Sequence, residues 1–297
     1  MFIIKNKKIF IGISVVLVLL SIIVLFVFPL KVGIDFKGGA LTEVVYKESR
    51  PAQAELDLKF KEVSLGPILI QPTGDLGYIV KSTNIDESRH ATLLQVLSQN
   101  GTNPLEEKSF NSIGPSVGRE LTRKAILSVI LVSLAIVLFI AFALRKVSKP
   151  VSSWKYGLMA IVSLLHDVII PVGIFAVLSH YYGAEIDTLF VVAVLTILGL
   201  SVSDTIVIFD RIRENLKNKV GGTFSETVGR SLDQSYVRSI FTSFTVIIVL
   251  LSLFFFGPES TKYFALMLTA GMFFGTYSSI FLASPLLVLI EEVQNRK

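Results

Sequence analysis

Six long apolar segments constrain this chain more than any other feature of its sequence. Hydrophobic residues make up 52% of the chain and charged residues 17%, whereas about a quarter of the residues in ordinary soluble domains are charged. A helix needs about 20 mainly apolar residues to cross ~30 Å of hydrocarbon. The segments that meet or approach this length are residues 9–30, 125–144, 156–179, 189–209, 240–256 and 263–290. We therefore predict a polytopic α-helical membrane protein with six transmembrane helices.

The distribution of Lys and Arg predicts how these helices are oriented. The basic residues gather in the loops 145–155 and 211–238 and at 296–297, whereas the opposite short loops, 180–188 and 257–262, contain one Lys and no Arg. By the positive-inside rule, both termini are expected in the cytoplasm. The first segment is expected to be a retained anchor, because its apolar run is longer than that of a signal peptide.

Composition excludes several classes of function. The chain contains no Cys, which rules out disulfides and thiolate metal sites. Its net charge of +5 reflects topology signals, and no nucleic-acid-binding motif accompanies the basic residues. We expect no partner nucleic acid and no cofactor.

The polar segment between the first two spans predicts a small domain outside the membrane. We assign residues 1–30 to the N-terminus and first span, 31–124 to this domain, and 125–297 to a five-helix transmembrane domain with a cytoplasmic C-terminus. Strands are expected at 41–47, 67–71, 76–82 and 105–113, and helices at 52–63 and 86–99. The order β-α-β-β-α-β is that of a ferredoxin-like split βαβ fold. The segment has no catalytic or metal-binding constellation around its one histidine, His90, so we expect a docking module and not an enzyme.

Ionisable residues occur in or next to three of the spans, where they are costly in lipid. His166 and Asp167 lie in the third span, Asp204 in the fourth, and Arg238 at the start of the fifth. Burial favours the neutral form of a carboxyl group, and a nearby guanidinium favours the ionised form. A carboxylate under both influences can load and release a proton. The alternatives are a structural hydrogen bond at Asp204, a topology signal at Arg238, and packing for His166 and Asp167.

Five motifs together resemble the SecD/SecF family of protein-export membrane proteins, within the resistance-nodulation-division superfamily. The resemblance covers nearly the whole chain, and its most specific match is the run from Ser201 to Asn215. The others are residues 111–121, residues 164–167, Arg238 with the Ser/Thr run after it, and a membrane-exit signature that includes Gly33, Asp35, Gly38 and Gly39. One anchor, one domain and then five spans is the layout of the family's SecF branch.

The resemblance implies a function and a set of partners. Members of this branch pair with SecD in a twelve-span unit of the bacterial cytoplasmic (inner) membrane, which associates with the SecYEG channel. This unit promotes export of preproteins after the SecA-driven step and uses the proton motive force. YajC and YidC are further candidate partners. The family's functional residues map onto Asp204 and Arg238, with the proton as coupling ion and sodium left open.

Three other functions compete with this interpretation. A proton-driven solute transporter of the same superfamily would carry larger outer domains and twice the number of spans. An intramembrane aspartyl protease would use Asp167 and Asp204 as a shared pair, but the Gly-x-Gly-Asp setting of such enzymes is missing. A passive scaffold of the translocon would look the same in sequence, because a structural Asp–Arg pair has the same residues.

Overall fold

The protein folds into two compact units, one built on the spans and one outside them. A computed structural model describes residues 2–63, 65–83, 86–143 and 151–295. Met1–Lys31 and Leu127–Lys297 form the membrane unit, and Val32–Ile126 form the outer domain. The basic residues at positions 145, 146, 149, 296 and 297, on which the orientation prediction partly rests, lie outside the described residues.

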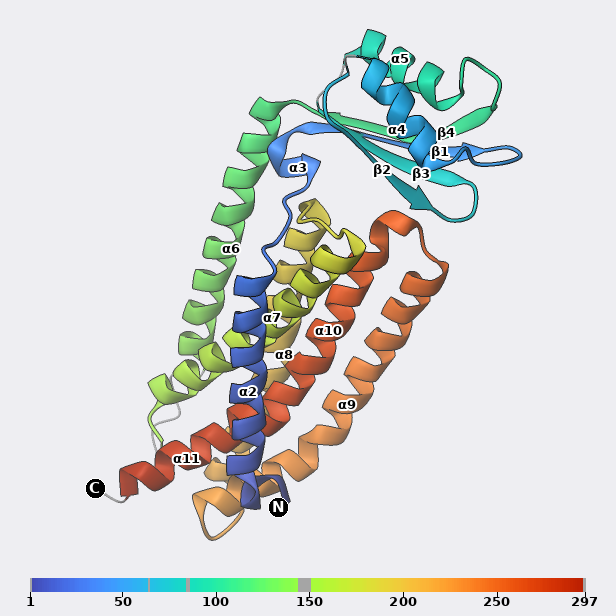
Figure 1. Ribbon diagram of the computed structural model, residues 1–297. Coiled ribbons are helices and arrows are strands. Elements are labelled where there is room, and N and C mark those ends of the chain that lie inside the picture. The colour runs from blue at the N-terminus through green and yellow to red at the C-terminus, as the bar shows by residue number, and fades with distance from the viewer. Residues whose placement is uncertain (1, 64, 84–85, 144–150, 296–297) are drawn as a thin grey trace. The chain divides into compact units, whose positions relative to one another are not determined.

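The outer domain is a four-stranded antiparallel sheet with two helices on one face (Figure 1). Its elements are α3 (Ile34–Lys37), β1 (Gly39–Tyr46), α4 (Gln53–Glu62), β2 (Ile68–Thr73), β3 (Gly77–Ser82), α5 (Glu87–Leu97) and β4 (Leu105–Ile113). The strand order is β2-β3-β1-β4, and every neighbouring pair is antiparallel. In each βαβ unit one strand therefore separates the two strands that the helix connects, which confirms the predicted split topology.

Alternation along the strands directs one face of the sheet toward the helices. In β1 the side chains of Ala40, Thr42, Val44 and Tyr46 are buried, and those between them are partly exposed, as expected for a strand with one covered face. The core also contains the helix residues Leu56, Phe60, Leu93 and Leu97. The Tyr46 hydroxyl donates a hydrogen bond of 3.0 Å to the Leu97 carbonyl, which ties the sheet to the end of α5.

The glycine-rich signature makes a tight turn where the outer domain begins. Gly38 has φ +81°, a conformation that favours glycine. A Cβ atom on Gly38 would lie 2.9 Å from Cα of Pro115 at the start of α6. A Cβ atom on Gly118 would lie 2.9 Å from the Phe36 carbonyl oxygen. The segment entering the domain and the helix leaving it therefore pack backbone against backbone.

The membrane unit contains six candidate spans among the described residues, which confirms the predicted fold class. Its elements are α1 (Phe2–Lys5), α2 (Lys7–Val27), α6 (Pro115–Ala143, which begins in the outer domain), α7 (Ser153–Tyr182), α8 (Thr188–Lys217), α9 (Phe224–Phe256), η1 (Glu259–Thr261), α10 (Lys262–Ser278), η2 (Ser279–Ala283) and α11 (Ser284–Asn295). The fifth helix begins 16 residues earlier than the predicted segment 240–256. Its first turns are amphipathic, with buried residues such as Val228 and Leu232 among charged ones, so hydropathy alone does not find them.

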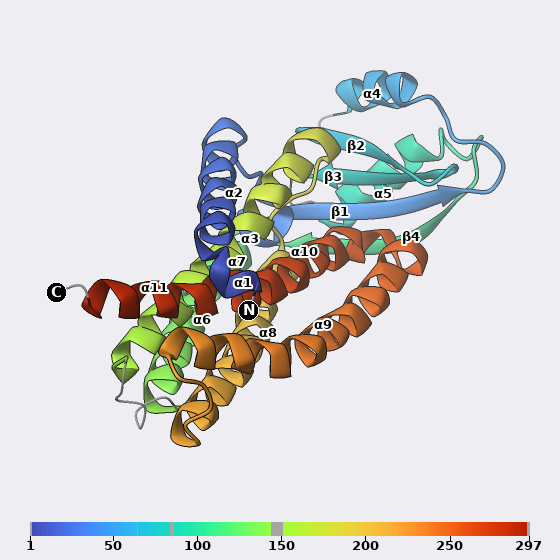
Figure 2. The same ribbon diagram turned by 90° about the horizontal axis from the view of Figure 1, so that it is seen from below.

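Helix α10 packs against α7, α8 and α9 and forms the centre of the bundle (Figures 1 and 2). Its Gly271 allows the closest approach: a Cβ atom there would lie 2.3 Å from Cγ1 of Ile197 in α8. Gly275, one turn later, faces Ser201 of α8. Small residues at this spacing let membrane helices approach closely, and polar side chains of α7, α8 and α10 can therefore meet.

The last span, which was predicted over residues 263–290, is bent. The five residues of η2 form a π-helical turn between α10 and α11, and Figure 1 shows α11 continuing at an angle to α10. Pro285 follows this turn and has no N–H to donate, and its ring crowds the carbonyl four residues earlier. The Ser284 hydroxyl instead donates to the Ser279 carbonyl at 3.1 Å. Single π-helical turns frequently mark functional sites.

Candidate functional site

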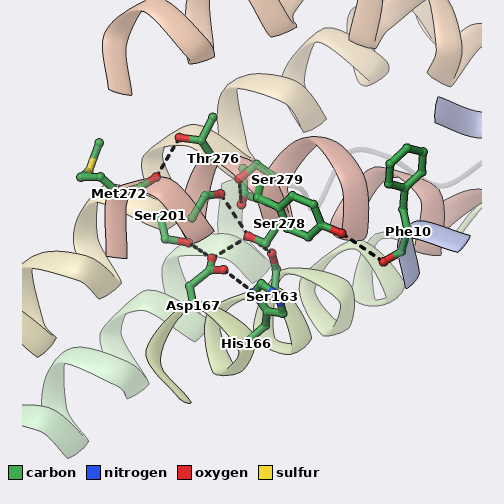
Figure 3. Close-up of polar contacts among 12 residues, drawn as sticks. Phe10, Ser163, His166, Asp167, Ser201, Met272, Thr276, Ser278 and Ser279 are labelled. Carbon is green, nitrogen blue, oxygen red and sulfur yellow. Dashed lines mark hydrogen bonds and ion pairs between the residues drawn. The ribbon is translucent and has the colours of Figure 1, made fainter. Parts of the chain in front are cut away.

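A fully buried carboxyl group, Asp167 of α7, lies where α7 meets α8 and α10 (Figure 3). One of its oxygens, Oδ2, accepts hydrogen bonds from the Ser201 hydroxyl of α8 and, at 2.7 Å, from the Ser278 hydroxyl of α10. The other, Oδ1, lies 2.8 Å from Nδ1 of His166. Each oxygen is thus hydrogen-bonded, as a buried polar group requires. The result is a polar junction of three spans.

More hydroxyl groups extend this junction along the helices. Ser163, one turn before Asp167 in α7, donates a hydrogen bond of 2.8 Å to the Ser278 hydroxyl. Thr205 of α8 and Ser279 of η2 are joined at 2.8 Å. The π-helical turn therefore begins at a residue that is bonded to α8, directly after a residue that is bonded to Asp167. The bend in the last span therefore adjoins the polar junction.

His166 is buried with one ring nitrogen paired and one unpaired. Its side chain is 2% exposed, and Nε2 has no hydrogen-bond partner among the described residues. The ring stacks on Tyr277 with centroids 6.0 Å apart and planes 17° apart. The pairing at Nδ1 fits a neutral imidazole that donates to the carboxylate, because a proton on Nε2 would have no acceptor.

Asp204 has a different environment from Asp167. It lies one turn after Ser201 on α8, is partly buried, and its Oδ2 atom is buried without a hydrogen-bond partner. The Ser239 hydroxyl of α9 lies beside this carboxyl group, but it forms no hydrogen bond of ordinary geometry and is also buried without a partner. No hydrogen bond joins Asp204 to Asp167, whose oxygens are bonded to His166, Ser201 and Ser278 instead, so the two carboxyl groups do not form a protease dyad.

The structure does not bring Arg238 and Asp204 into an ion pair. The Arg238 side chain is exposed on α9, although its neighbour Ser239 faces Asp204. The predicted site residues therefore form two groups in the membrane unit: a closed one around Asp167 and an open one around Asp204. The signature residues Gly33, Asp35, Gly38 and Gly39 belong to the outer domain. No group of ligands that could hold a metal ion occurs among the described residues.

The sequence interpretation missed the hydroxyl partners from the last span. Ser278 and Ser279 look like ordinary small residues in an apolar segment. The available signals were Gly271 and Gly275 four residues apart, which predict a close helix contact, and the proline that follows the serines. Together these features indicate that the serines face a neighbouring helix at a distortion of the span.

Comparison with known proteins places this architecture in a family. The family model described as "Protein export membrane protein SecD/SecF, C-terminal" matches residues 93–293. The chain belongs to the SecD/SecF family. It is 43% identical over 298 residues to the protein translocase subunit SecF of Thermobaculum terrenum, an alignment that covers 96% of this chain and 92% of that one. It is 34% identical over 291 residues to SecF of Anaerolinea thermophila, covering 97% of this chain and 94% of that one.

The SecD/SecF fold is also evident from a solved structure. The crystal structure of SecDF from Thermus thermophilus, described as a translocon-associated membrane protein, matches 98% of this chain with a TM-score of 0.82 and 28% identity. This chain spans 38% of that SecDF chain. The family assignment makes this a multi-pass subunit of the protein translocase, of the SecF type.

Proposed function

We propose that this SecF-type subunit works with SecD to couple a transmembrane proton gradient to preprotein export. Export would proceed through SecYEG after the SecA-driven step, with YajC and YidC as further candidate partners. Both termini would lie in the cytoplasm, and the outer domain would act as a docking surface. Asp204 would carry the proton, and Arg238 would respond to its charge.

The observation that carries this proposal is the contrast between the two buried aspartates. Three donors already occupy the two oxygens of Asp167, so this buried carboxyl group is well hydrogen-bonded where it lies. Oδ2 of Asp204 is buried without a partner, and an unpaired buried acceptor is costly. The described residues give this oxygen no hydrogen bond that an added proton would break, and the proton removes a charge from a span. Of the two carboxyl groups, Asp204 is therefore the one arranged to exchange protons.

Ser239 and Arg238 allow the position of α9 to depend on whether Asp204 is protonated. The Ser239 hydroxyl already faces Asp204, and Arg238 is the next residue along the helix. When Asp204 is ionised, its charge attracts the guanidinium and favours rotation of α9 toward it. When Asp204 is protonated, this attraction is lost and the exposed position of Arg238 is favoured. The proton then shifts α9 between two positions.

A stripe of small residues on the outside of α8 and an exposed arginine on α9 support an association with SecD. On α8, Gly199 and Ser203 are exposed four residues apart, and on α9 Arg238, Thr242 and Thr245 are exposed at helical spacing. Small residues let a partner helix approach closely, and a charged residue on a span is expensive in lipid unless a partner covers it. The SecDF chains of Thermus thermophilus and Bacillus subtilis are longer proteins that contain a segment similar to this chain. A SecD subunit is the matching occupant for this surface.

The experiment follows completion of export by the subunit reconstituted with SecD and SecYEG. A preprotein is stalled part-way by SecA, ATP is then removed, and completion is measured with and without a proton gradient. The variants are wild type, Asp204→Asn and Asp187→Asn. Asp187 is a matched control because it caps the same helix and Asn caps as well as Asp.

The expected result is gradient-dependent completion by wild type and Asp187→Asn but not by Asp204→Asn. Assembly with SecD is checked first by co-purification of each variant. If Asp204→Asn assembles and completes export like wild type, the proton-coupling proposal is wrong. The subunit would then act as a passive scaffold of the translocase.

A further inference from the structure

One tyrosine of α10 places its hydroxyl against the first span. The Tyr277 hydroxyl donates a hydrogen bond of 3.3 Å to the Phe10 carbonyl of α2, at the right of Figure 3. The Ser14 hydroxyl, one turn further along α2, lies beside this phenol and is buried without a hydrogen-bond partner. Tyr277 therefore meets two polar groups of α2 in an otherwise apolar helix contact.

The ring of the same tyrosine lies against His166. The two rings are nearly parallel, at 17°, with centroids 6.0 Å apart. A cation over the face of a tyrosine ring is attracted to it within about 6 Å. A proton that reaches His166 would create an imidazolium over this ring. Its second N–H, at Nε2, would also need an acceptor that the present geometry does not supply. Both effects act on the position of Tyr277.

We propose that Tyr277 is a positioning residue that links the His166–Asp167 pair to α2. A change in the charge of this pair moves the tyrosine ring, and its hydroxyl then moves α2. The path runs from Asp167 through a hydrogen bond to His166, through ring stacking to Tyr277, and through its hydroxyl to Phe10. This inference goes beyond the proposed function, because it concerns a proton at the His166–Asp167 pair and not the proton carried by Asp204. The chain continues from α2 through Lys31 into the outer domain, so movement of α2 acts directly on the segment that precedes that domain.

Among the described residues, few titratable groups lie close enough to Tyr277 and His166 to make the position of Tyr277 depend on pH. Beside His166 on α7 is Asp167, α10 contributes the phenol of Tyr277, and α8 contributes Asp204, one turn after the Ser201 that bonds to Asp167. The nearby polar group of α2 is the Ser14 hydroxyl, which does not titrate. A test must therefore separate His166–Asp167 from Asp204.

The test measures the distance between α2 and α10 at acidic and alkaline pH. The chain has no Cys, so spin labels can be attached at Cys residues introduced in place of Val16 and Phe273, which are 54% and 60% exposed. Pulsed electron resonance then gives the distance distribution in the subunit reconstituted with SecD. Tyr277→Phe keeps the ring and removes the hydroxyl. Tyr263→Phe is the matched control, because Tyr263 lies on the same helix and its hydroxyl donates to the Tyr182 carbonyl at 3.0 Å.

We expect the label distance to shift between the two pH values in the parent protein and in Tyr263→Phe. The shift is expected to be lost in Tyr277→Phe and kept in Asp204→Asn. Loss of one neutral hydrogen bond corresponds to about a fivefold change in the balance between the two distances. A full shift in Tyr277→Phe, or no shift in the parent protein, would overturn the proposal. A shift that survives Tyr277→Phe and vanishes in Asp204→Asn would assign the movement to Asp204 instead.

The same variants in the export assay separate failure of this inference from failure of the proposed function. If Asp204→Asn stops gradient-dependent completion and Tyr277→Phe completes export like wild type, proton coupling holds and the Tyr277 path is wrong. If Asp204→Asn also completes export like wild type, the proposed function itself is wrong. Reduced completion by Tyr277→Phe but not by Tyr263→Phe supports the path.

Discussion

The Ser278 hydroxyl donates a hydrogen bond of 2.7 Å to the Asp167 carboxyl group, 111 positions earlier in the chain. This bond joins the last span to the third one directly before the π-helical turn of the last span. Ser201 adds a second bond to the same oxygen from the fourth span. The polar junction is therefore also a structural element, because it holds three helices together in a part of the bundle where hydrophobic packing alone gives no specificity.

Ser278→Ala is expected to destabilise the membrane unit. It removes one donor from a fully buried carboxyl group and leaves the Ser163 hydroxyl without its acceptor. A loss of about 1 to 3 kcal/mol is typical when a buried polar group loses its partner. The measurement is the midpoint of thermal unfolding in detergent. The control is Ser252→Ala, whose exposed hydroxyl bonds only within its own helix; an equal loss in both variants would contradict this role of Ser278.

Gly271→Ala is expected to push α8 and α10 apart. Its Cβ atom would lie 2.3 Å from Cγ1 and 2.5 Å from Cδ1 of Ile197, and Ile197 is itself buried. Overpacking of this kind costs about 1 to 3 kcal/mol. Gly199→Ala is the control, because a Cβ atom there meets no other atom within 4 Å and Ala favours a helix over Gly. Thermal unfolding of the subunit without SecD should show a lower midpoint for Gly271→Ala alone.

The sequence predicts the fold of this chain well because its signals are local. Each span is marked by its own apolar residues, and the order of strands and helices in the outer domain follows from alternation and turn residues such as Gly74 and Asp75. The start of α9 at Phe224 was missed for the same reason: its first turns are amphipathic, and only tertiary packing stabilises them.

The candidate site could be predicted only in part because it depends on contacts between spans. A charged residue in an apolar segment, such as Asp204, is visible in sequence. Whether its oxygen is paired depends on which face of another helix it meets. The sequence cannot show that Ser201 bonds to Asp167 while Asp204, three residues later, has an unpaired oxygen. The exposure of Arg238 likewise follows from the rotation of α9.

The outer domain should lose stability above about pH 10 through Tyr46. Burial raises the pKa of the Tyr46 hydroxyl well above its usual value of 10.0, so the folded protein keeps this proton after the unfolded chain has released it. Stability is therefore complete below pH 10 and falls as the pH rises toward the higher folded pKa. Urea unfolding at increasing pH measures this slope. Tyr46→Phe should flatten it, and an unchanged slope would contradict the assignment.

Gly199→Phe is expected to weaken assembly with SecD while leaving the fold of the subunit intact. Gly199 lies on the exposed side of α8 with open space around the position of a Cβ atom, so a side chain can leave the backbone there without a collision. A partner helix that packs against this stripe of small residues would collide with the new ring. The measurement is the amount of SecD that co-purifies with the tagged subunit, with thermal unfolding as the check on folding.

Val15→Phe, at an exposed position of α2, is the matched control for added bulk on a span. If Gly199→Phe retains SecD as well as Val15→Phe does, the stripe on α8 faces lipid, and the polar residues of α9 become the remaining candidates for the SecD contact.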